Sequence, residues 1–175
     1  MKIAITGHTS GIGKALFDYF VSYTPIGFSR SNGYDINHVE DRKTIVNQCV
    51  EYDVFINNAY SNGSNSQLDM LQEMYNAWQG NDKLIINISS RITDFVLPLD
   101  SQERMYQTHK KDQDTFCLGK IRSPHVVNLK LGMVDTPRVR SYNHNKLAVE
   151  DVVKIVSFVL DNRDSYKITT LTVGL

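Results

Sequence analysis

Residues 2–13 read Lys2-Ile3-Ala4-Ile5-Thr6-Gly7-His8-Thr9-Ser10-Gly11-Ile12-Gly13. The apolar run at the start predicts a buried strand, and the glycines behind it predict a sharp turn into a helix. Glycine lets backbone amides approach a pyrophosphate closely, while the N-terminus of the helix adds partial positive charge. The stretch therefore predicts a nucleotide-phosphate site, with an ordinary glycine-rich turn as the alternative. The residues expected to bind are Gly7, Thr9, Ser10, Gly11, Ile12 and Gly13.

The composition indicates a single domain spanning residues 1–175. The chain is 41% hydrophobic and 22% charged, which is enough to bury a core. Its 19 basic and 19 acidic residues leave no net field that would recruit nucleic acid or a membrane surface. Cys49 and Cys117 make no disulfide framework, the histidines share no metal-ligand spacing, and the first residues lack the apolar region of a secretory signal. We expect a cytoplasmic protein with free thiols and no bound metal.

Short β-branched runs alternate with stretches of helical periodicity along the chain. This alternation predicts an α/β fold, a doubly wound parallel sheet of about seven strands with helices on both faces. The strands are expected at 2–6, 25–28, 34–36, 53–57, 83–88, 124–130 and 168–173. The helices are expected at 11–22, 38–51, 66–79, 101–119 and 148–161.

Thr6 to Gly13 resembles the TGxxxGIG signature of the short-chain dehydrogenases/reductases, a family of NAD- or NADP-dependent enzymes with the Rossmann fold. Two further segments extend the likeness over nearly the whole chain. Residues 57–59 are similar to the family's NNAG segment, with Tyr60 in place of its glycine, and residues 127–136 resemble the segment ending PGxVxT, with Leu131 in place of its proline. The resemblance implies cofactor contacts at Asp35 beside the adenine, at Asn57, Asn58 and Ala59, and at Val134 and Thr136 beside the nicotinamide.

The residues behind the second expected strand favour NADP over NAD. A carboxylate there would accept hydrogen bonds from a ribose 2′-hydroxyl and would repel a 2′-phosphate. This chain has Ser29-Arg30-Ser31 instead. A guanidinium can bind a phosphate in a bidentate manner, and the two serine hydroxyls can assist. A solvated surface arginine is the alternative.

Tyr106 and Lys110 resemble the family's YxxxK motif, and side chains four residues apart lie on one face of a helix. A free phenol has a pKa near ~10, which a nearby cation lowers by stabilising the phenolate. The resemblance implies that Tyr106 exchanges the proton and that Lys110 holds the nicotinamide ribose. It also implies that Ser90 donates a hydrogen bond to the substrate carbonyl, where it would stabilise the developing alkoxide.

Each of these assignments has a competitor in the sequence. Tyr142 and Lys146 form a second YxxxK pair, but their stretch is poor in apolar residues and contains asparagines that disfavour a helix interior. Ser89 is the runner-up to Ser90, and a serine pair that merely starts a turn is a further alternative. The family also uses an asparagine to hold a water near the lysine, and the candidates here are Asn62, Asn65 and Asn76.

The chain is markedly shorter than ordinary members of the family, with residues missing between Asn57 and Ser90 and between Thr136 and Ala148. The second gap usually holds the helical lid over the substrate, so residues 137–147 alone remain to cover it. We expect an open, shallow site that suits a substrate carried by a larger molecule, or one completed by a second subunit. Because the Tyr-Lys helix commonly forms the dimer face in the family, a homodimer or homotetramer is expected.

The leading hypothesis is an NADP-dependent oxidoreductase that interconverts a carbonyl and an alcohol on a small-molecule or carrier-linked substrate. The alternative from another class is a non-catalytic NADP-binding sensor or scaffold whose Ser-Tyr-Lys set is a relic. A third hypothesis is a sugar-nucleotide epimerase or dehydratase, which normally needs an additional substrate domain. Retention of the full Ser-Tyr-Lys set favours the oxidoreductase.

Overall fold

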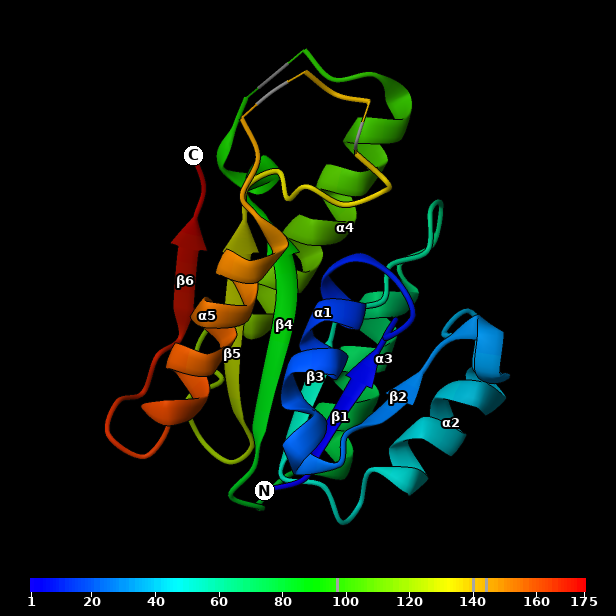
Figure 1. The fold of residues 1–175 in the computed structure, drawn as a ribbon. Helices are drawn as coiled ribbons and strands as arrows, with labels where there is room; N and C mark the ends of the chain where they lie inside the picture. Colours follow the sequence, from blue (N-terminus) through cyan, green and yellow to red (C-terminus); the bar gives the residue numbers. More distant parts are fainter. Residues whose placement is uncertain (97, 140, 144) are drawn as a thin grey trace.

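The computed structural model describes residues 1–96, 98–139, 141–143 and 145–175, and within them it contains one sheet of six strands (Figure 1). All neighbouring strands are parallel, in the order β2-β1-β3-β4-β5-β6. The carboxyl ends of the strands therefore meet at one edge, where ligands bind in sheets of this type. The strands are β1 (Ile3–Thr6), β2 (Ile26–Phe28), β3 (Val54–Asn57), β4 (Leu84–Ser90), β5 (His125–Leu131) and β6 (Thr170–Val173).

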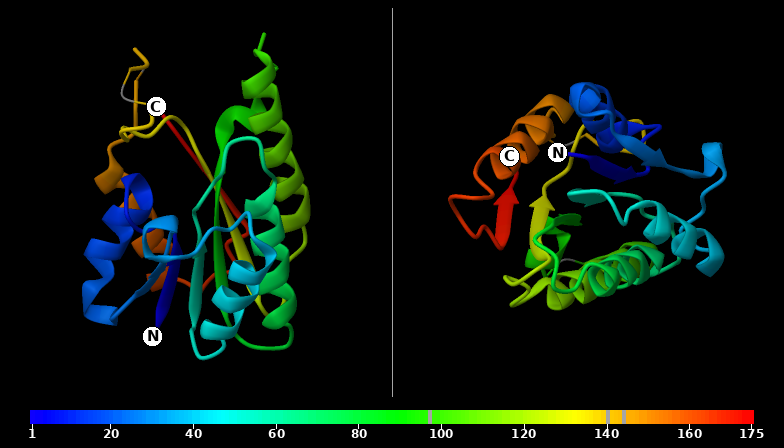
Figure 2. Two further views of the ribbon diagram at one scale, coloured as in Figure 1. Left: turned by 90° about the vertical axis from the view of Figure 1, so that its right-hand side faces the viewer. Right: turned by 90° about the horizontal axis from the view of Figure 1, so that it is seen from below.

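Helices cover both faces of the sheet (Figure 2). Alternate side chains of the strands point to opposite faces, so Ile3 and Ile5 pack with α1 and α5, while Ala4 packs with α2, α3 and α4. The helices are α1 (Gly11–Tyr19), α2 (Val39–Gln48), α3 (Ser66–Ala77), α4 (Ser101–Cys117) and α5 (Val149–Asp161). Three short 3₁₀ helices are η1 (Phe20–Tyr23), η2 (Arg30–Asn32) and η3 (Arg91–Asp94).

Local sequence explains where α4 begins. Asp100 precedes the helix in an extended conformation and accepts a hydrogen bond from the Glu103 amide at 2.8 Å, while the Glu103 carboxylate accepts from the Asp100 amide at 3.1 Å. This reciprocal pair satisfies two amides that a helix start leaves without partners. The cap fixes the first turn of the helix that carries Tyr106 and Lys110.

Three asparagines stand side by side inside the sheet. Asn57 of β3, Asn87 of β4 and Asn128 of β5 are paired in register, and all three are buried. The Asn57 amide donates to Asn87 Oδ1 at 2.9 Å, and the Asn87 amide donates to Asn128 Oδ1 at 2.9 Å. We call this row the amide ladder. Its hydrogen bonds offset the cost of placing polar groups in an apolar core.

The predicted fold class is confirmed, with one strand fewer than expected. The strand predicted at 34–36 is wrong, so β2 is the edge strand. Gly33 ends η2 with a φ of 91°, and the chain then turns back toward α2. The Asp35 amide donates to Asp41 Oδ2 at 2.9 Å and is therefore occupied by a side chain of α2. The predicted helices are confirmed with boundary shifts of up to three residues, as at 11–22, where the α-helix ends at Tyr19 and η1 follows, and at 38–51, where it ends at Gln48.

Within the described ranges, no helix combines the length and the apolar character needed to cross a membrane.

Candidate active site

The glycine turn between β1 and α1 is closed tightly at the carboxyl edge of the sheet. Gly7 has a φ of 73° and Gly11 a φ of 51°, values that L side chains rarely adopt. A Cβ atom on Gly13 would lie 2.2 Å from the Gly7 carbonyl oxygen. Ser10 precedes α1, but its side chain makes no capping hydrogen bond, and the first turn contains no acidic residue. The amides at the start of α1 are therefore free of a side-chain cap and of negative charge, as an anion site requires.

The residues that follow β3 hold this turn in place through hydrogen bonds to Thr6. Thr6 Oγ1 accepts hydrogen bonds from the amides of Asn58 and Ala59, both at 3.0 Å. The Asn58 side-chain amide donates to the Thr6 carbonyl at 3.0 Å, and a Cβ on Gly7 would lie 2.9 Å from the same nitrogen. Asn58 and Ala59 thus border the turn as predicted, whereas the Asn57 side chain is fully buried in the amide ladder and faces the core.

The segment behind β2 presents Arg30 to solvent. Arg30 is exposed, and its guanidinium makes no hydrogen bond or ion pair with the residues that the structure describes. Ser29 is buried, and its hydroxyl oxygen lies 2.9 Å from that of Ser31. Asp35 is half-buried and accepts from the Asn37 amide at 3.0 Å. The guanidinium is thus free for a ligand, while Ser29 and Asp35 already hold neighbouring groups.

Thr136, in the segment after β5, packs against the glycine turn. A Cβ on Gly11 would lie 3.2 Å from Thr136 Cγ2, so the two residues are in close contact. Val134 is buried and pairs with Leu147 as an isolated parallel bridge, which anchors the segment between them. The two residues predicted to contact the nicotinamide therefore differ in exposure. The Thr136 side chain is half-exposed at the turn, whereas the Val134 side chain is buried, so only its backbone could reach a cofactor.

Ser90, at the carboxyl end of β4, lies beside Tyr106 of α4. Burial raises the pKa of Tyr106 above its ordinary value, while a hydrogen bond with Ser90 and the positive charge of Arg138 act in the opposite direction. Ser90 is half-exposed, and its oxygen also accepts from the Ile92 amide at 3.2 Å. The neighbouring Ser89 is buried and donates to Asp114 at 2.6 Å, so its hydroxyl lies away from Tyr106. Of the two serines, Ser90 is the one that joins the phenol.

Lys110 lies one helical turn after Tyr106 and is buried, with 3% of its surface exposed. Its Nζ atom lies 5.6 Å from the centre of the Tyr106 ring and donates to Gln67 Oε1 at 2.7 Å and to the Ile88 carbonyl at 2.8 Å. Burial lowers the pKa of Lys110 to about 7, against the opposing effect of the Asp114 carboxylate. A neutral amine has two hydrogens, which match these two acceptors.

The second YxxxK pair lies outside any helix. Tyr142 is exposed, and Lys146 lies 3.9 Å from Asp135. His144, between them, is outside the described residues. Tyr106 and Lys110, by contrast, share α4 as the sequence predicts.

Searches with the sequence against family models and curated proteins found no match. The structure resembles many solved ones. The 3-ketoacyl-(acyl-carrier-protein) reductase from Brucella melitensis complexed with NADH aligns with a TM-score of 0.81 at 16% identity, over 99% of this chain and 96% of that one. The 3-α-hydroxysteroid dehydrogenase from Pseudomonas sp. B-0831 complexed with NADH has a TM-score of 0.80 at 15% identity, over 99% and 95%. A short-chain dehydrogenase from Burkholderia cenocepacia J2315 in complex with NADP has a TM-score of 0.77 at 17% identity, over 98% and 88%.

This is the short-chain dehydrogenase/reductase fold. At these identities the likeness is one of fold, and the chemistry has to be argued from the residues present.

Tyr60 is the departure from the short-chain dehydrogenase/reductase signature that changes the site most. Its ring packs edge-on against Tyr106, with 4.9 Å between ring centres, and lies 5.3 Å from Lys110 Nζ. Its hydroxyl lies 3.2 Å from His109 Nδ1. Tyr60 therefore covers Lys110. The sequence shows this tyrosine in place of the glycine of the NNAG segment, but its packing against Lys110 was not predicted.

Gln67 accepts a hydrogen bond from Lys110 and was not predicted from the sequence. Its side-chain amide donates to the carbonyls of Asn57 at 2.9 Å and Ile88 at 3.1 Å, so the whole side chain is held in the core. The three asparagines considered for this place lie elsewhere: Asn62 accepts from Arg138, Asn65 donates to Asp112, and Asn76 is exposed on α3. A buried glutamine two residues into α3 gives no motif, so spacing alone could not reveal it.

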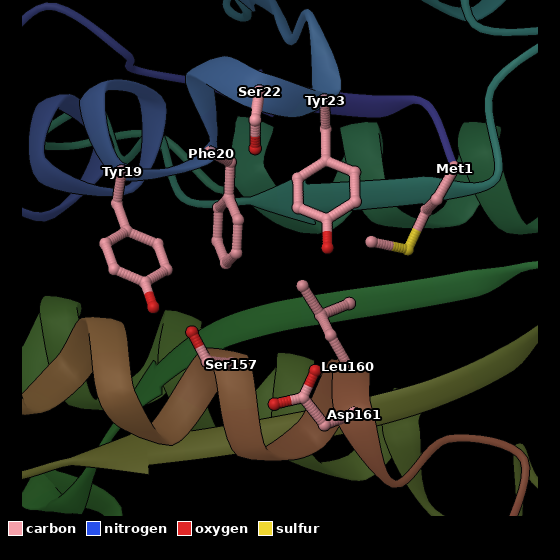
Figure 3. A pocket seen from close by; sticks show the side chains of 8 residues that line it. All are labelled: Met1, Tyr19, Phe20, Ser22, Tyr23, Ser157, Leu160 and Asp161. Carbon is pink, nitrogen blue, oxygen red and sulfur yellow. The ribbon is translucent and has the colours of Figure 1, made fainter.

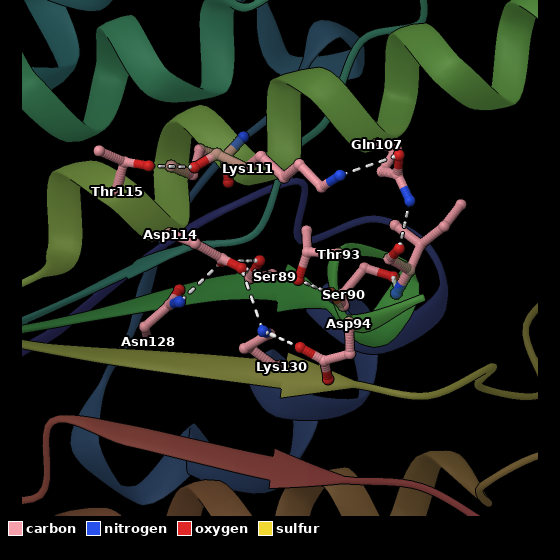
Figure 4. Close-up of polar contacts among 12 residues, drawn as sticks. Ser89, Ser90, Thr93, Asp94, Gln107, Lys111, Asp114, Thr115, Asn128 and Lys130 are labelled. Atoms are coloured by element: carbon pink, nitrogen blue, oxygen red, sulfur yellow. Dashed lines mark hydrogen bonds and ion pairs between the residues drawn. The ribbon is translucent and has the colours of Figure 1, made fainter. Parts of the chain in front are cut away.

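An ionic network centred on Asp114 holds the strand end that carries Ser90 (Figure 4). Asp114 Oδ1 accepts from Ser89 at 2.6 Å and from Asn128 at 2.8 Å, and Oδ2 accepts from Thr93 at 2.7 Å. Lys130 Nζ lies 3.3 Å from Asp114 and also pairs with Asp94. Helix α4, β4, β5 and η3 are thereby joined directly behind Ser90.

Replacing Asp114 with asparagine is expected to lower the free energy of unfolding by about 2 kcal/mol, because charge-assisted hydrogen bonds are lost and Lys130 loses one of its two carboxylates. Urea denaturation measures this loss. Asp112→Asn on the same helix is the control, since that exposed carboxylate accepts from Asn65 alone and should change stability by less than about 0.5 kcal/mol. Equal losses in the two variants would show that the network adds nothing.

A hollow of about 300 Å³ lies at the opposite edge of the sheet (Figure 3). Met1, Tyr19 and Tyr23 line it from one side, and Ser157 and Asp161 of α5 line it from the other. Because these residues are at the amino-terminal edge of the strands, the hollow is separate from the Ser90–Tyr106 site. The described ranges contain no group of three or more His, Cys, Asp or Glu side chains that could hold a metal ion.

Proposed function

We propose that this protein is an NADP-dependent oxidoreductase that interconverts a carbonyl and an alcohol, with Ser90, Tyr106 and Lys110 as its catalytic groups. One observation carries the proposal: Ser90 and Tyr106 lie beside each other and near Lys110, at the same edge of the sheet as the glycine turn. Solved structures of the same fold are described as dehydrogenases and reductases in complex with NADP or NADH.

The residues at this edge fit a dinucleotide. The uncapped start of α1 and the glycine turn would hold the pyrophosphate through Gly7, Thr9, Ser10, Gly11, Ile12 and Gly13. Arg30, which is exposed and lacks a carboxylate partner among the described residues, would bind the 2′-phosphate beside Ser31. Asp35 would lie beside the adenine, and Thr136 with the Val134 backbone would contact the nicotinamide. When bound, NADPH supplies the hydride.

Tyr106 would act as the general acid in carbonyl reduction. Its raised pKa keeps the phenol protonated at neutral pH, and the protonated form is the one that can give a proton to the carbonyl oxygen. Ser90 would donate a second hydrogen bond to that oxygen and stabilise its negative charge as the alkoxide forms. Lys110 would stabilise the phenolate left behind and, with a pKa of about 7, could return a proton to it.

The burial of Lys110 behind the Tyr60 ring supports a second candidate function, the non-catalytic NADP-binding sensor. Lys110 has little exposed surface, and the Tyr60 ring lies against it, so a ribose could reach Lys110 only after Tyr60 moved. Titration with NADPH, followed by an absorbance screen over ketones, aldehydes and sugars, separates the two candidates. NADPH binding with turnover supports the oxidoreductase, binding without turnover supports the sensor, and the absence of NADPH binding contradicts both.

Replacing Arg30 with glutamine is expected to weaken NADPH binding by about tenfold and to leave NADH binding unchanged, because the 2′-phosphate is the group that the guanidinium would pair with. Fluorescence titrations of the native protein and the variant with both nucleotides measure the effect. Arg122→Gln serves as the control, since Arg122 is an exposed arginine in the loop before β5. Equal affinities of the native protein for NADPH and NADH would contradict the assignment.

A further inference from the structure

Arg138 reaches the site from the segment that follows Thr136. Its guanidinium carbon lies 5.2 Å from the centre of the Tyr60 ring, and its Nη2 atom donates to Asn62 Oδ1. A planar guanidinium stacked on an aromatic ring keeps its remaining N–H groups free at its edges. The Asn62 amide fixes the orientation of the side chain while leaving its charge unneutralised.

The charge of Arg138 is unpaired within the part of the chain that the structure describes. No ion pair joins Arg138 to a carboxylate among the described residues, and the side chain is exposed. The neighbouring Asp135 lies 3.9 Å from Lys146, and Asp112 accepts from Asn65. Burial is the largest influence on the neighbouring groups, raising the pKa of Tyr60 and of Tyr106 and lowering that of Lys110, and the charge of Arg138 acts to lower the pKa of all three. A free cation at the mouth of the site attracts an anion.

We propose that Arg138 binds a carboxylate or a similar anionic group of the substrate, so that the protein acts on acidic carbonyl compounds. This inference rests on the proposed function, because it assigns a substrate class to the same site. The centre of the Tyr60 ring lies 5.2 Å from the Arg138 guanidinium carbon and 4.9 Å from the centre of the Tyr106 ring, so the cation and the catalytic tyrosine are neighbours of the same ring. A substrate whose carbonyl and carboxylate are separated by about one ring matches this arrangement, and 4-formylbenzoate is a probe of that shape.

The test compares 4-formylbenzoate with its neutral methyl ester. Binding of each compound to the NADP⁺-saturated protein is measured by calorimetry, and reduction of each is followed with NADPH. We expect the acid to be preferred over the ester by about tenfold or more in both assays, because a charge-assisted pair forms with the acid alone. Arg138→Gln should abolish this preference, Arg138→Lys should retain part of it, and Arg122→Gln should leave it intact.

The outcomes separate this inference from the proposed function. Preference for the ester, equal treatment of acid and ester, or a preference that survives in Arg138→Gln would overturn the anion site even if NADPH-dependent turnover is observed. Arg138-dependent binding of the acid without any turnover would support the anion site and contradict the oxidoreductase. A loss of NADPH affinity in Arg138→Gln, with the acid preference unchanged, would assign the arginine to a cofactor phosphate and overturn the proposal.

Discussion

Replacing Tyr106 with phenylalanine is expected to lower kcat for carbonyl reduction by about 10³-fold, because the proton that neutralises the alkoxide then has no positioned donor. NADPH should still bind, since the change removes one oxygen and retains the ring that packs on Tyr60. Single-turnover measurement of NADPH oxidation at saturating substrate isolates the chemical step from binding and product release.

Tyr142→Phe is the matched control for this variant. Tyr142 belongs to the other YxxxK pair, is exposed, and lies outside any helix, so its hydroxyl should contribute nothing to kcat. Undiminished turnover in Tyr106→Phe would remove Tyr106 from its role, and the phenol of Tyr60 would be tested next because it lies against the same lysine.

Replacing Gly13 with alanine is expected to weaken NADPH binding by about 100-fold and to destabilise the protein by about 3 kcal/mol. The new Cβ would lie 2.2 Å from the Gly7 carbonyl oxygen and 2.6 Å from Asn58 Nδ2. A backbone oxygen cannot move aside as a side chain can, so the backbone of the turn has to shift. Its amides would then no longer point together toward the pyrophosphate. Fluorescence titration with NADPH and urea denaturation give the two quantities.

Gly80→Ala separates the effect on binding from the effect on stability. Gly80 has a φ of 80° with open space around it, so alanine there costs about 1–2 kcal/mol of backbone strain and touches nothing near the glycine turn. Its NADPH affinity should equal that of the native protein. If Gly13→Ala bound NADPH as tightly as the native protein, the turn would not be the phosphate site.

The sequence predicted the sheet well because its signals are local. The strands are buried on both faces and read as unbroken apolar runs, as in Val54-Phe55-Ile56 and Leu84-Ile85-Ile86. The strand expected at 34–36 was wrong for a tertiary reason: the Asp41 carboxylate of α2 binds the Asp35 amide that a ladder would need. The sequence of residues 34–36 gives no indication of this hydrogen bond with Asp41.

The parts of the site that lie in local sequence motifs could be predicted. The parts that depend on contacts between side chains far apart in the sequence could not. The glycine turn follows from local spacing, and Ser90 and Tyr106 follow from the family resemblance; they lie at one edge because all the strands are parallel. The burial of Lys110 depends on Gln67 and Tyr60, which reach it from other elements. The cofactor, the roles of the catalytic groups and the oligomeric state stay predictions.

The amide ladder sets how far the three central strands are staggered along one another. The Asn57 amide donates to Asn87 on the next strand, the Asn87 amide donates to Asn128, and the Asn128 amide donates to Asp114 on α4. A slip of one residue would turn an asparagine onto the opposite face of the sheet, which α1 and α5 cover, and leave its neighbours without partners in an apolar interior. The same bonds thereby hold β3, β4 and β5 in register, so mutation of any of the three asparagines should shift Ser90, at the end of β4, relative to the Tyr106 phenol.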